Sequence, residues 1–341
     1  MDPLDDYGSA PMRALPSEHR IAFQGQPGAY SHLACRTHYP ELEPLPCASF
    51  EDAFAAVREG AARYAMIPVD NSVAGRVADV HHLLPRCGLH IVAEHFQRVN
   101  HQLLAIPGAS LETIEVVESH VHAIGQCREF LRRHGYRAKV VADTAGAAAE
   151  VAAAKDPTRA AIASRLAAEI YGLQVLATDI EDAEHNTTRF LVLAREPRWP
   201  SWRDGPVITT FIFRVRNRPA ALYKALGGFA TNGVNMVKLE SYLDGAFSQA
   251  QFYADIMGHP EEDRVRYAFE ELRFFSHHVE ILGLSIPPIP CASGWADRRA
   301  RGGVGRGGGS FRPSRARRSS GPVCRARADF VARAPRARKR P

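Results

Sequence analysis

The sequence predicts an α/β protein in which a two-lobed α/β region is followed by a smaller βαββαβ unit. Between Arg20 and Arg195, short apolar runs alternate with stretches of helical spacing, which is the pattern of α/β units. A break rich in proline and tryptophan follows at residues 196–206, and after it a second, more regular alternation begins. The chain of 341 residues is long enough for two folded units, each with its own core.

The first region contains six short apolar runs that we interpret as strands, at residues 21–23, 64–69, 114–117, 138–142, 160–163 and 190–193. Three helices between them have start signals. Ser49 and Asp52 form a capping-box pattern before 50–58, Asp143 or Thr144 precedes an Ala-rich stretch to 154, and Ser164 precedes 166–171. This alternation predicts largely parallel sheets. The long β-like stretch at 90–106 is expected to cross between the two lobes.

The second unit has the order strand, helix, two strands, helix, strand. We expect a strand at 207–215, a helix with Pro219 in its first turn and Leu222, Leu226 and Phe229 at helical spacing, and a hairpin of 234–243 with 247–257 around Asp244-Gly245. A helix at 264–275 and a strand at 279–286 complete the unit. This order is that of a ferredoxin-like βαββαβ arrangement.

Composition narrows the class of protein. An apolar content of 45% with no run approaching about 18 apolar residues predicts a soluble globular chain without a membrane span. The N-terminal stretch carries Asp2, Asp5 and Asp6 and lacks the apolar core of a secretory signal, so we expect a cytoplasmic protein. The six cysteines include no C-x-x-C pair and are expected to be reduced thiols.

The positive charge is concentrated at the C-terminal end. The net charge is +6, but residues 291–341 carry fifteen Lys and Arg against Asp297 and Asp329. This segment is rich in Gly, Arg, Ser, Pro and Ala and has almost no periodic apolar residues, so we expect it to be disordered. Two interpretations stay open for it: a functional tail that contacts nucleic acid through phosphates, or a frameshifted or read-through end in a GC-rich gene.

Two polar segments follow apolar strands and are expected to face one cleft. One is 184–190 (EHNTTRF), and the other is 68–77 (PVDNSVAGRV), where Asn71 and Ser72 precede a helix start. Arginine and hydroxyl groups at such strand ends are suited to holding an anion. Taken singly, each segment is better explained by a solvated arginine, a turn or a helix cap than by a binding site. The paired histidines at 81–82 and 277–278 lack a convincing set of metal ligands, so no metal site is expected.

Four segments in sequence order resemble the prephenate dehydratase family: 23–31 (FQGQPGAYS), 68–77 with its Asp-Asn-Ser-x-x-Gly core, 119–127 (SHVHAIGQC) and 186–190 (NTTRF). The resemblance covers about 20–286. It implies a catalytic domain at 20–196 with a two-lobed fold like that of periplasmic binding proteins, a linker at 197–206 and an ACT regulatory domain at 207–286. The N-terminal 1–19 and the basic tail 287–341 would then be disordered.

The resemblance implies a monofunctional lyase of L-phenylalanine biosynthesis that converts prephenate to phenylpyruvate, water and carbon dioxide without a metal or cofactor. In this interpretation Thr188 is the catalytic hydroxyl, Arg189 binds or orients a carboxylate, and Phe190 completes their motif. His122 and Gln126 are one helical turn apart and share a face. The substrate-binding set implied by the four segments is Gly28, Ala29, Tyr30, Ser31, Asn71, Ser72, His122, Gln126 and Thr187.

The resemblance also implies L-phenylalanine as an allosteric ligand of a homodimer or homotetramer. The allosteric set expected in the second unit is Ala221, Leu222, Asn232, Val234, Asn235, Glu240 and Ser241. Two departures from the family pattern weaken this part: alanine replaces a glycine at Ala220, and Tyr242-Leu243 replaces an Arg-Pro pair. The alternatives are an arogenate or cyclohexadienyl dehydratase, a non-catalytic two-lobed binding protein, and a nucleic-acid-associated regulator that uses the tail.

Overall fold

The computed structural model describes residues 17–203, 205–243 and 250–287, all of which belong to one compact unit. Our expectations for residues before 17, for the Asp244-Gly245 turn and for the tail beyond 287 lie outside the described residues. The proposed boundaries between catalytic domain, linker and ACT domain stay predictions. No described helix is both long enough and apolar enough to cross a membrane.

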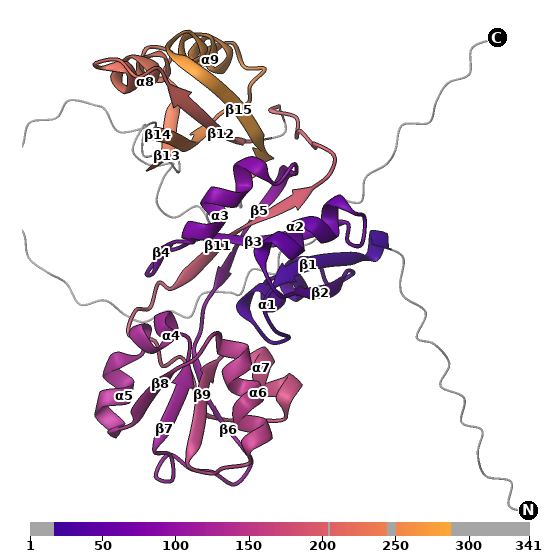
Figure 1. Ribbon diagram of the computed structural model, residues 1–341, viewed down its shortest axis with the longest axis vertical. Coiled ribbons are helices and arrows are strands. Elements are labelled where there is room, and N and C mark those ends of the chain that lie inside the picture. Colours follow the sequence, from indigo (N-terminus) through magenta and orange to yellow (C-terminus); the bar gives the residue numbers. More distant parts are fainter. Residues whose placement is uncertain (1–16, 204, 244–249, 288–341) are drawn as a thin grey trace, which may run out of the picture. The chain divides into compact units, whose positions relative to one another are not determined.

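The first lobe is built on strands of the larger sheet, in the order β5-β11-β3-β1-β2 (Figure 1). Its strands are β1 (Arg20–Gln24), β2 (Glu43–Cys47), β3 (Tyr64–Asn71), β5 (His90–Arg98) and β11 (Thr187–Ala194), with β4 (Gly75–Arg76) paired to β3. Its helices are α1 (Tyr30–His38), α2 (Phe50–Arg58) and α3 (Ala78–Leu83), with 3-10 turns at Ser17–His19 and Leu84–Arg86. The capping box expected for α2 is confirmed, because Ser49 and Asp52 exchange both hydrogen bonds.

The second lobe has its own sheet, in the order β10-β6-β9-β7-β8. The strands are β6 (Gln102–Ala105), β7 (Val116–Ser119), β8 (Arg137–Val140), β9 (Arg159–Ala163) and β10 (Gln174–Ala177), and the helices are α4 (Val121–Gln126), α5 (Arg128–His134), α6 (Thr144–Ala154) and α7 (Arg165–Tyr171). Asp143 and Ser164 cap α6 and α7, as expected. The chain crosses between the lobes after β5, within the stretch 90–106 that was expected to cross. It crosses back before β11.

The expectation of largely parallel sheets is wrong, since both sheets are mixed. β1 is parallel to β2 and β3, but β11 is antiparallel to both β3 and β5. In the second lobe, β6 is antiparallel to β9 and β10. The antiparallel strands are those that flank the two crossings, so their direction is set by the path between lobes and not by local βαβ units. The sequence also gave no signal for β2, whose two prolines are tolerated because it is an edge strand.

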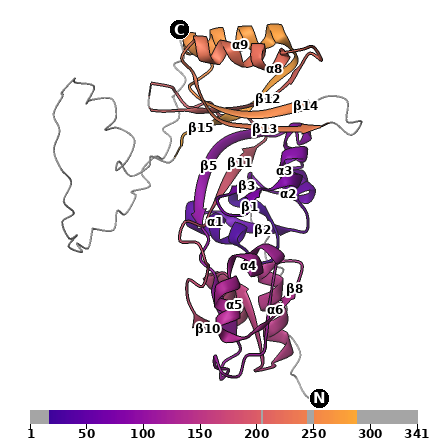
Figure 2. The ribbon, with the colours of Figure 1, turned by 90° about the vertical axis from the view of Figure 1, so that its left-hand side faces the viewer.

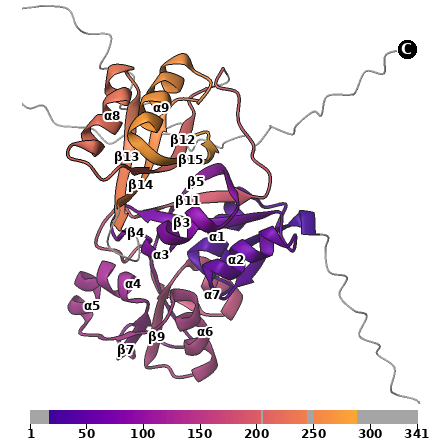
Figure 3. The ribbon, with the colours of Figure 1, turned by 45° about the horizontal axis from the view of Figure 1, so that its top comes forward.

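The C-terminal βαββαβ segment, residues 208–285, has the predicted order. It comprises β12 (Ile208–Val215), α8 (Ala221–Thr231), β13 (Asn235–Leu243), β14 (Ala250–Met257), α9 (Asp263–Phe275) and β15 (Ser276–Ser285). Its strands lie in the order β13-β14-β12-β15, all antiparallel, and α8 and α9 lie side by side on one face (Figure 2, Figure 3). Pro219 precedes α8 instead of lying in its first turn.

Two features join this segment to the first lobe. β15 pairs with β5 at Gly283 and Ile91, which makes the larger sheet continuous. A Cβ atom at Gly283 would lie 2.1 Å from the Ile91 carbonyl oxygen, so the close approach requires glycine. Tyr253 of β14 is fully buried in the same hydrophobic cluster as Leu191 and Leu193 of β11.

Candidate active site

The two polar strand ends predicted from the sequence meet in the structure. Asn71, the last residue of β3, lies opposite Thr188 of β11 in the strand register. Its Nδ2 donates to Thr188 Oγ1 at 3.0 Å and to Asn186 Oδ1 at 2.8 Å. The neighbouring Ser72 hydroxyl donates to the His185 carbonyl at 2.6 Å and accepts from the Thr187 amide at 2.9 Å. The two segments, more than a hundred residues apart in sequence, are therefore bonded side chain to side chain.

The chain after Asn71 forms a hairpin, so the expected helix start at Ser72 is wrong. Asn71 Oδ1 accepts from the amides of Val73 and Ala74 at 3.0 and 2.7 Å, and the chain then returns as β4. Asparagine favours such turns because its side chain replaces a backbone acceptor. These two amides are therefore used within the turn.

A chain of polar contacts continues from Asn186 to residues of both lobes. Asn186 Nδ2 donates to Gln126 Oε1 at 2.9 Å, and the same oxygen lies 2.7 Å from His101 Nε2. His101 Nδ1 in turn lies 2.8 Å from the Tyr30 hydroxyl. Tyr30 begins α1 in the first lobe, Gln126 ends α4 in the second, and His101 lies at the crossing between β5 and β6. We call Tyr30, His101, Gln126, Asn186, Asn71 and Thr188 the polar chain.

The donors and acceptors of the polar chain follow from the chemistry of His101. Burial lowers the pKa of this histidine, outweighing its contacts with Gln126 and Glu181, so the neutral ring is favoured. Because Gln126 Oε1 can only accept, Nε2 carries the proton and Nδ1 accepts from the Tyr30 hydroxyl. Burial also raises the pKa of Tyr30 well above its ordinary value, which keeps this phenol protonated; its single proton is shared between His101 Nδ1 at 2.8 Å and the Asn100 carbonyl oxygen at 2.9 Å.

Thr188 ends the polar chain with its proton unused. Its oxygen accepts from Asn71, and among the described residues its own O–H donates to no acceptor. The residue is 9% exposed, so little of it is open to water. The arrangement therefore provides one oriented hydroxyl donor, which is the type of group that stabilises a developing negative charge on oxygen.

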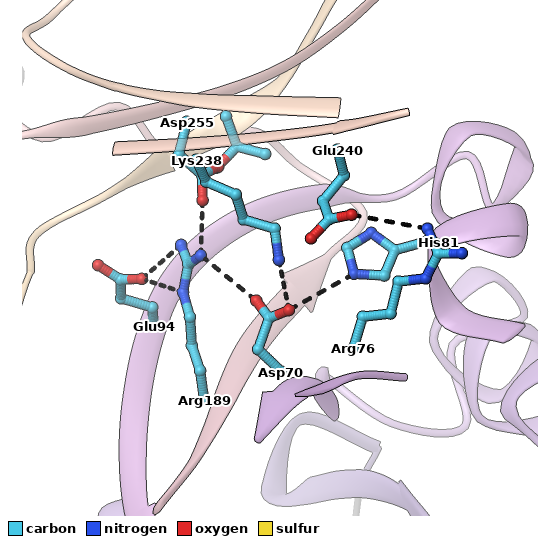
Figure 4. Close-up of polar contacts among 9 residues, drawn as sticks. Asp70, Arg76, His81, Glu94, Arg189, Lys238, Glu240 and Asp255 are labelled. Atoms are coloured by element: carbon cyan, nitrogen blue, oxygen red, sulfur yellow. Dashed lines mark hydrogen bonds and ion pairs between the residues drawn. The ribbon is translucent and has the colours of Figure 1, made fainter. Parts of the chain in front are cut away.

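The two residues that follow Thr188 do not contact its hydroxyl: Arg189 points to the other face of β11, and Phe190 enters the core. Side chains alternate along a strand, so Arg189 lies on the opposite face of β11 from Thr188. Its guanidinium contacts Glu94 Oε2 at 2.7 Å and Asp255 Oδ2 at 2.5 Å (Figure 4). Burial would lower its pKa, but these carboxylates outweigh burial and raise it. Phe190 is 1% exposed and packs with Ile21 and Phe23. We expected Arg189 to bind a carboxylate of the substrate, but in the structure its guanidinium is already paired with two carboxylates of the protein.

The remaining residues of the expected substrate-binding set lie outside the polar chain. Gly28 forms a lobe-to-lobe contact, since its carbonyl accepts from Ser164 Oγ at 2.6 Å and a Cβ would lie 2.9 Å from Ala167 Cα. Ala29 caps α1 and Ser31 is buried in its first turn. His122 is exposed, one turn before Gln126, and lies outside the polar chain. Thr187 contributes its backbone to Ser72.

Sequence reasoning missed His101 and did not single out Asn186 within its motif. His101 is 2% exposed and Asn186 1%, and both are paired through side-chain atoms. The available signal was the polar triplet at residues 100–102, which directly precedes the apolar run 103–106. Buried polar side chains need partners, so a polar residue inside a predicted crossing strand indicates a network. Among the described residues, no group of three His, Cys, Asp or Glu side chains is placed to hold a metal ion.

The C-terminal segment contains a cavity of about 280 Å³ before α8. Two residues of the expected allosteric set, Ala221 and Leu222, line it together with Arg216, Asn217 and Arg218. The other five lie elsewhere: Asn232 donates to the Gly228 carbonyl, Asn235 contacts Met257, Val234 is buried, Ser241 is exposed, and Glu240 lies 3.6 Å from Arg76.

The chain is similar to characterised proteins over most of its length. The family model described as prephenate dehydratase matches residues 21–198. A bifunctional N-acyl-homoserine lactone acylase/prephenate dehydratase of Komagataeibacter europaeus is 50% identical over 268 residues, covering 78% of this chain and 95% of the relative. The chloroplastic arogenate dehydratase/prephenate dehydratase 1 of Arabidopsis thaliana is 39% identical over 282 residues, covering 78% of this chain and 72% of the relative. A prephenate dehydratase structure from Arthrobacter aurescens, in complex with L-Phe, has 30% identity and a TM-score of 0.72, covering 78% of this chain and 89% of that one.

Proposed function

This chain belongs to the prephenate dehydratase family, and we propose that it converts prephenate to phenylpyruvate, water and carbon dioxide. It would thus act as a carbon–oxygen lyase of L-phenylalanine biosynthesis. The observation that carries the proposal is the Thr188 hydroxyl, whose oxygen is held by Asn71 and whose proton is free for a ligand. Both residues lie within the range that the family model matches.

The chemistry of this reaction requires little more than an oriented donor. The bond between the ring and its carboxylate breaks, and its electron pair moves into the ring as carbon dioxide leaves. The bond between the ring and the 4-hydroxyl breaks at the same time, its electron pair stays on the oxygen, and this oxygen takes one proton from solvent and leaves as water. The product ring is aromatic, so the reaction is strongly downhill, and the enzyme has to supply orientation and stabilisation of charge on the departing oxygen.

In the proposed mechanism, Thr188 donates a hydrogen bond to the departing hydroxyl. A threonine hydroxyl is a very weak acid, so its role is to stabilise the leaving oxygen in a site with little water rather than to release its proton. Asn71 fixes the direction of this donation because it occupies the acceptor side of the threonine oxygen. Gln126 contacts Asn71 directly, with Nε2 donating to Asn71 Oδ1 at 3.5 Å, and also through Asn186; His101 acts on Asn71 through Gln126.

The test is phenylpyruvate formation by the purified protein, with prephenate and arogenate as alternative substrates. Arogenate carries an amino group in place of the side-chain keto group, and relatives that match this chain bear the names of both dehydratases. The ratio of kcat/KM for the two substrates decides between them. If a folded preparation acts on neither, the proposed function is wrong and the non-catalytic binding protein becomes the better interpretation.

The C-terminal segment is proposed to be an ACT domain that binds L-phenylalanine and inhibits turnover. Support comes from the 30% identical structure in complex with L-Phe and from the cavity at Ala221 and Leu222. Calorimetric titration with L-phenylalanine tests binding, and Leu222→Ala should weaken it. Size-exclusion chromatography with light scattering tests the expected homodimer or homotetramer. Inhibition without any measurable effect of Leu222→Ala would place the ligand elsewhere.

A second candidate activity is amide hydrolysis of N-acyl-homoserine lactones. The observation that favours it is the 50% identity to the relative whose name gives both activities, over 95% of that relative. The assay is release of homoserine lactone from an N-acyl substrate, measured beside prephenate turnover with the same preparation. Thr188→Val should remove prephenate turnover, and retention of acylase activity in this variant would separate the two sites.

A further inference from the structure

Four buried or half-buried charged residues alternate in sign between the first lobe and the C-terminal segment (Figure 4). Asp70 and Arg189 are register partners on β3 and β11. Lys238 and Asp255 are register partners on β13 and β14. The two pairs face each other, with Lys238 against Asp70 and Arg189 against Asp255. We call these four residues the charge quartet.

The contacts within the charge quartet are close and well shielded from water. Arg189 Nη1 lies 2.5 Å from Asp255 Oδ2 and 3.9 Å from Asp70 Oδ2, and Lys238 Nζ bonds to Asp70 Oδ1. The Asp255 side chain is fully buried, and those of Arg189 and Lys238 are 12% and 14% exposed. Thr210 Oγ1 donates to the second Asp255 oxygen at 2.7 Å. Glu94 lies 2.7 Å from Arg189 and His81 lies 3.8 Å from Asp70, so removal of the Asp255 or Lys238 charge leaves the remaining charges of the quartet unbalanced in a poorly solvated position rather than wholly unpaired.

The charge quartet lies directly beside the polar chain in sequence and in space. Asp70 precedes Asn71, and Arg189 follows Thr188. The pairing of β3 with β11 is irregular here, because the register shifts between Arg189 and Phe190, where the partner of Phe190 is Pro68. Proline has no N–H to donate, and Val69 is the extra residue of the shift. Beyond this irregularity β3 still pairs with β11 and β4, and β11 still pairs with β5, so the side-chain contacts of the charge quartet act on strand ends that remain in the sheet.

A third contact links the same two elements. Glu240, two residues after Lys238 on β13, lies 3.6 Å from Arg76 of β4, which follows the Asn71 turn. Alternate residues of one strand point to the same face, so Lys238 and Glu240 both reach the β3–β4 hairpin. The C-terminal segment therefore contacts both strand ends and the turn that carry Asn71 and Thr188.

We propose that Asp70 and Arg189 are positioning residues for Asn71 and Thr188, and that the C-terminal segment controls the Thr188 hydroxyl through Lys238 and Asp255. A ligand that moves β13 against β14 changes the spacing of Lys238 and Asp255. The change passes through the charge quartet to the two strand ends, and the Asn71–Thr188 hydrogen bond shifts with them. This inference deepens the proposed dehydratase function and rests on it, naming the path by which that site is regulated.

The test uses Asp255→Asn and Lys238→Met in the full chain. Asp255→Asn keeps the shape and the Thr210 contact but removes the charge, and Lys238→Met removes the cation from a half-buried position. We expect each to lower kcat for prephenate at least about tenfold, with KM changed less than about threefold, and Lys238→Arg to restore most of the loss. Asp263→Asn is the matched control, because it removes an exposed ion pair with Arg266 from α9 of the same segment.

A second readout does not depend on turnover. Amide hydrogen exchange of peptides covering 64–76 and 184–194 should be faster in Asp255→Asn than in the wild type, while peptides from β7 to β9 are unchanged. If the wild type has no prephenate turnover, the proposed function is wrong. Amide hydrogen exchange then tests by itself whether the charge quartet holds the two strand ends.

Three results would overturn the inference: wild-type kcat and exchange in both folded variants, equal losses in Asp263→Asn, or failure of both variants to fold, which would make the charge quartet a purely structural element.

Discussion

Thr188→Val removes the donor hydroxyl and keeps the branched shape of the side chain. The stability cost should be small, because Asn71 Nδ2 keeps its second acceptor, Asn186 Oδ1, at 2.8 Å. A lost hydrogen bond whose partner stays paired costs about 1 kcal/mol or less. The catalytic cost should be much larger, since removal of one preorganised donor to a developing oxyanion lowers kcat by about 10²–10³-fold, or roughly 2.7–4 kcal/mol.

The assay compares kcat and KM for prephenate in wild type, Thr188→Val and Thr188→Ser, with thermal unfolding of each. We expect Thr188→Ser to retain most of kcat, because the serine hydroxyl can accept from Asn71 in the same way. The valine variant should unfold within a few degrees of the wild type. Wild-type turnover in Thr188→Val would refute the assignment of the hydroxyl. An equal loss in both variants would also refute it, because the methyl group rather than the donor would then matter.

Three further predictions follow. His101→Phe should lower kcat about tenfold, or 1.4 kcal/mol, because Gln126 loses a donor; unchanged kcat would separate His101 from the site. Burial, assisted by His38, lowers the pKa of His95 to about 4, so the unfolded chain takes up the proton first as pH falls below about 6.5. The associated stability, about 2 kcal/mol between pH 6.5 and 5, should be lost in acid, and urea unfolding of His95→Gln should show a correspondingly smaller pH dependence. Gly28→Ala should destabilise the fold by about 1–3 kcal/mol, because φ is +93° and the new Cβ would lie 2.9 Å from Ala167 Cα; an unchanged urea midpoint would contradict that contact.

Local signals predicted the helices better than the sheets. Ser49, Asp143 and Ser164 each cap the helix that their position in the sequence indicated, because capping depends on residues three or four positions apart. Strand direction depends on the route of the chain between lobes, which no local pattern contains. For this reason these three helix starts were correct, while the expectation of largely parallel sheets was wrong.

The candidate site was predictable where two polar segments each ended an apolar strand. Asn71 and Thr188 were placed together on that reasoning, and the structure pairs them at 3.0 Å. The helix expected after Asn71 was wrong because the asparagine side chain closes a hairpin instead. The polar triplet at residues 100–102 indicated that His101 needs a polar partner, but no local pattern showed that the fold would bring Gln126 and Tyr30 to it.

The tripeptide from Thr188 to Phe190 combines three environments because side chains alternate along β11. Thr188 joins the polar chain, Arg189 reaches the carboxylates of Glu94 and Asp255, and Phe190 enters the core beside Ile21. A run of consecutive residues therefore need not indicate one binding surface. In a strand, neighbouring residues lie on opposite faces, so one can carry the reactive group while the next anchors the strand to the structure behind it. That geometry explains why an arginine can belong to the same motif as the hydroxyl and still contact the C-terminal segment instead of a ligand.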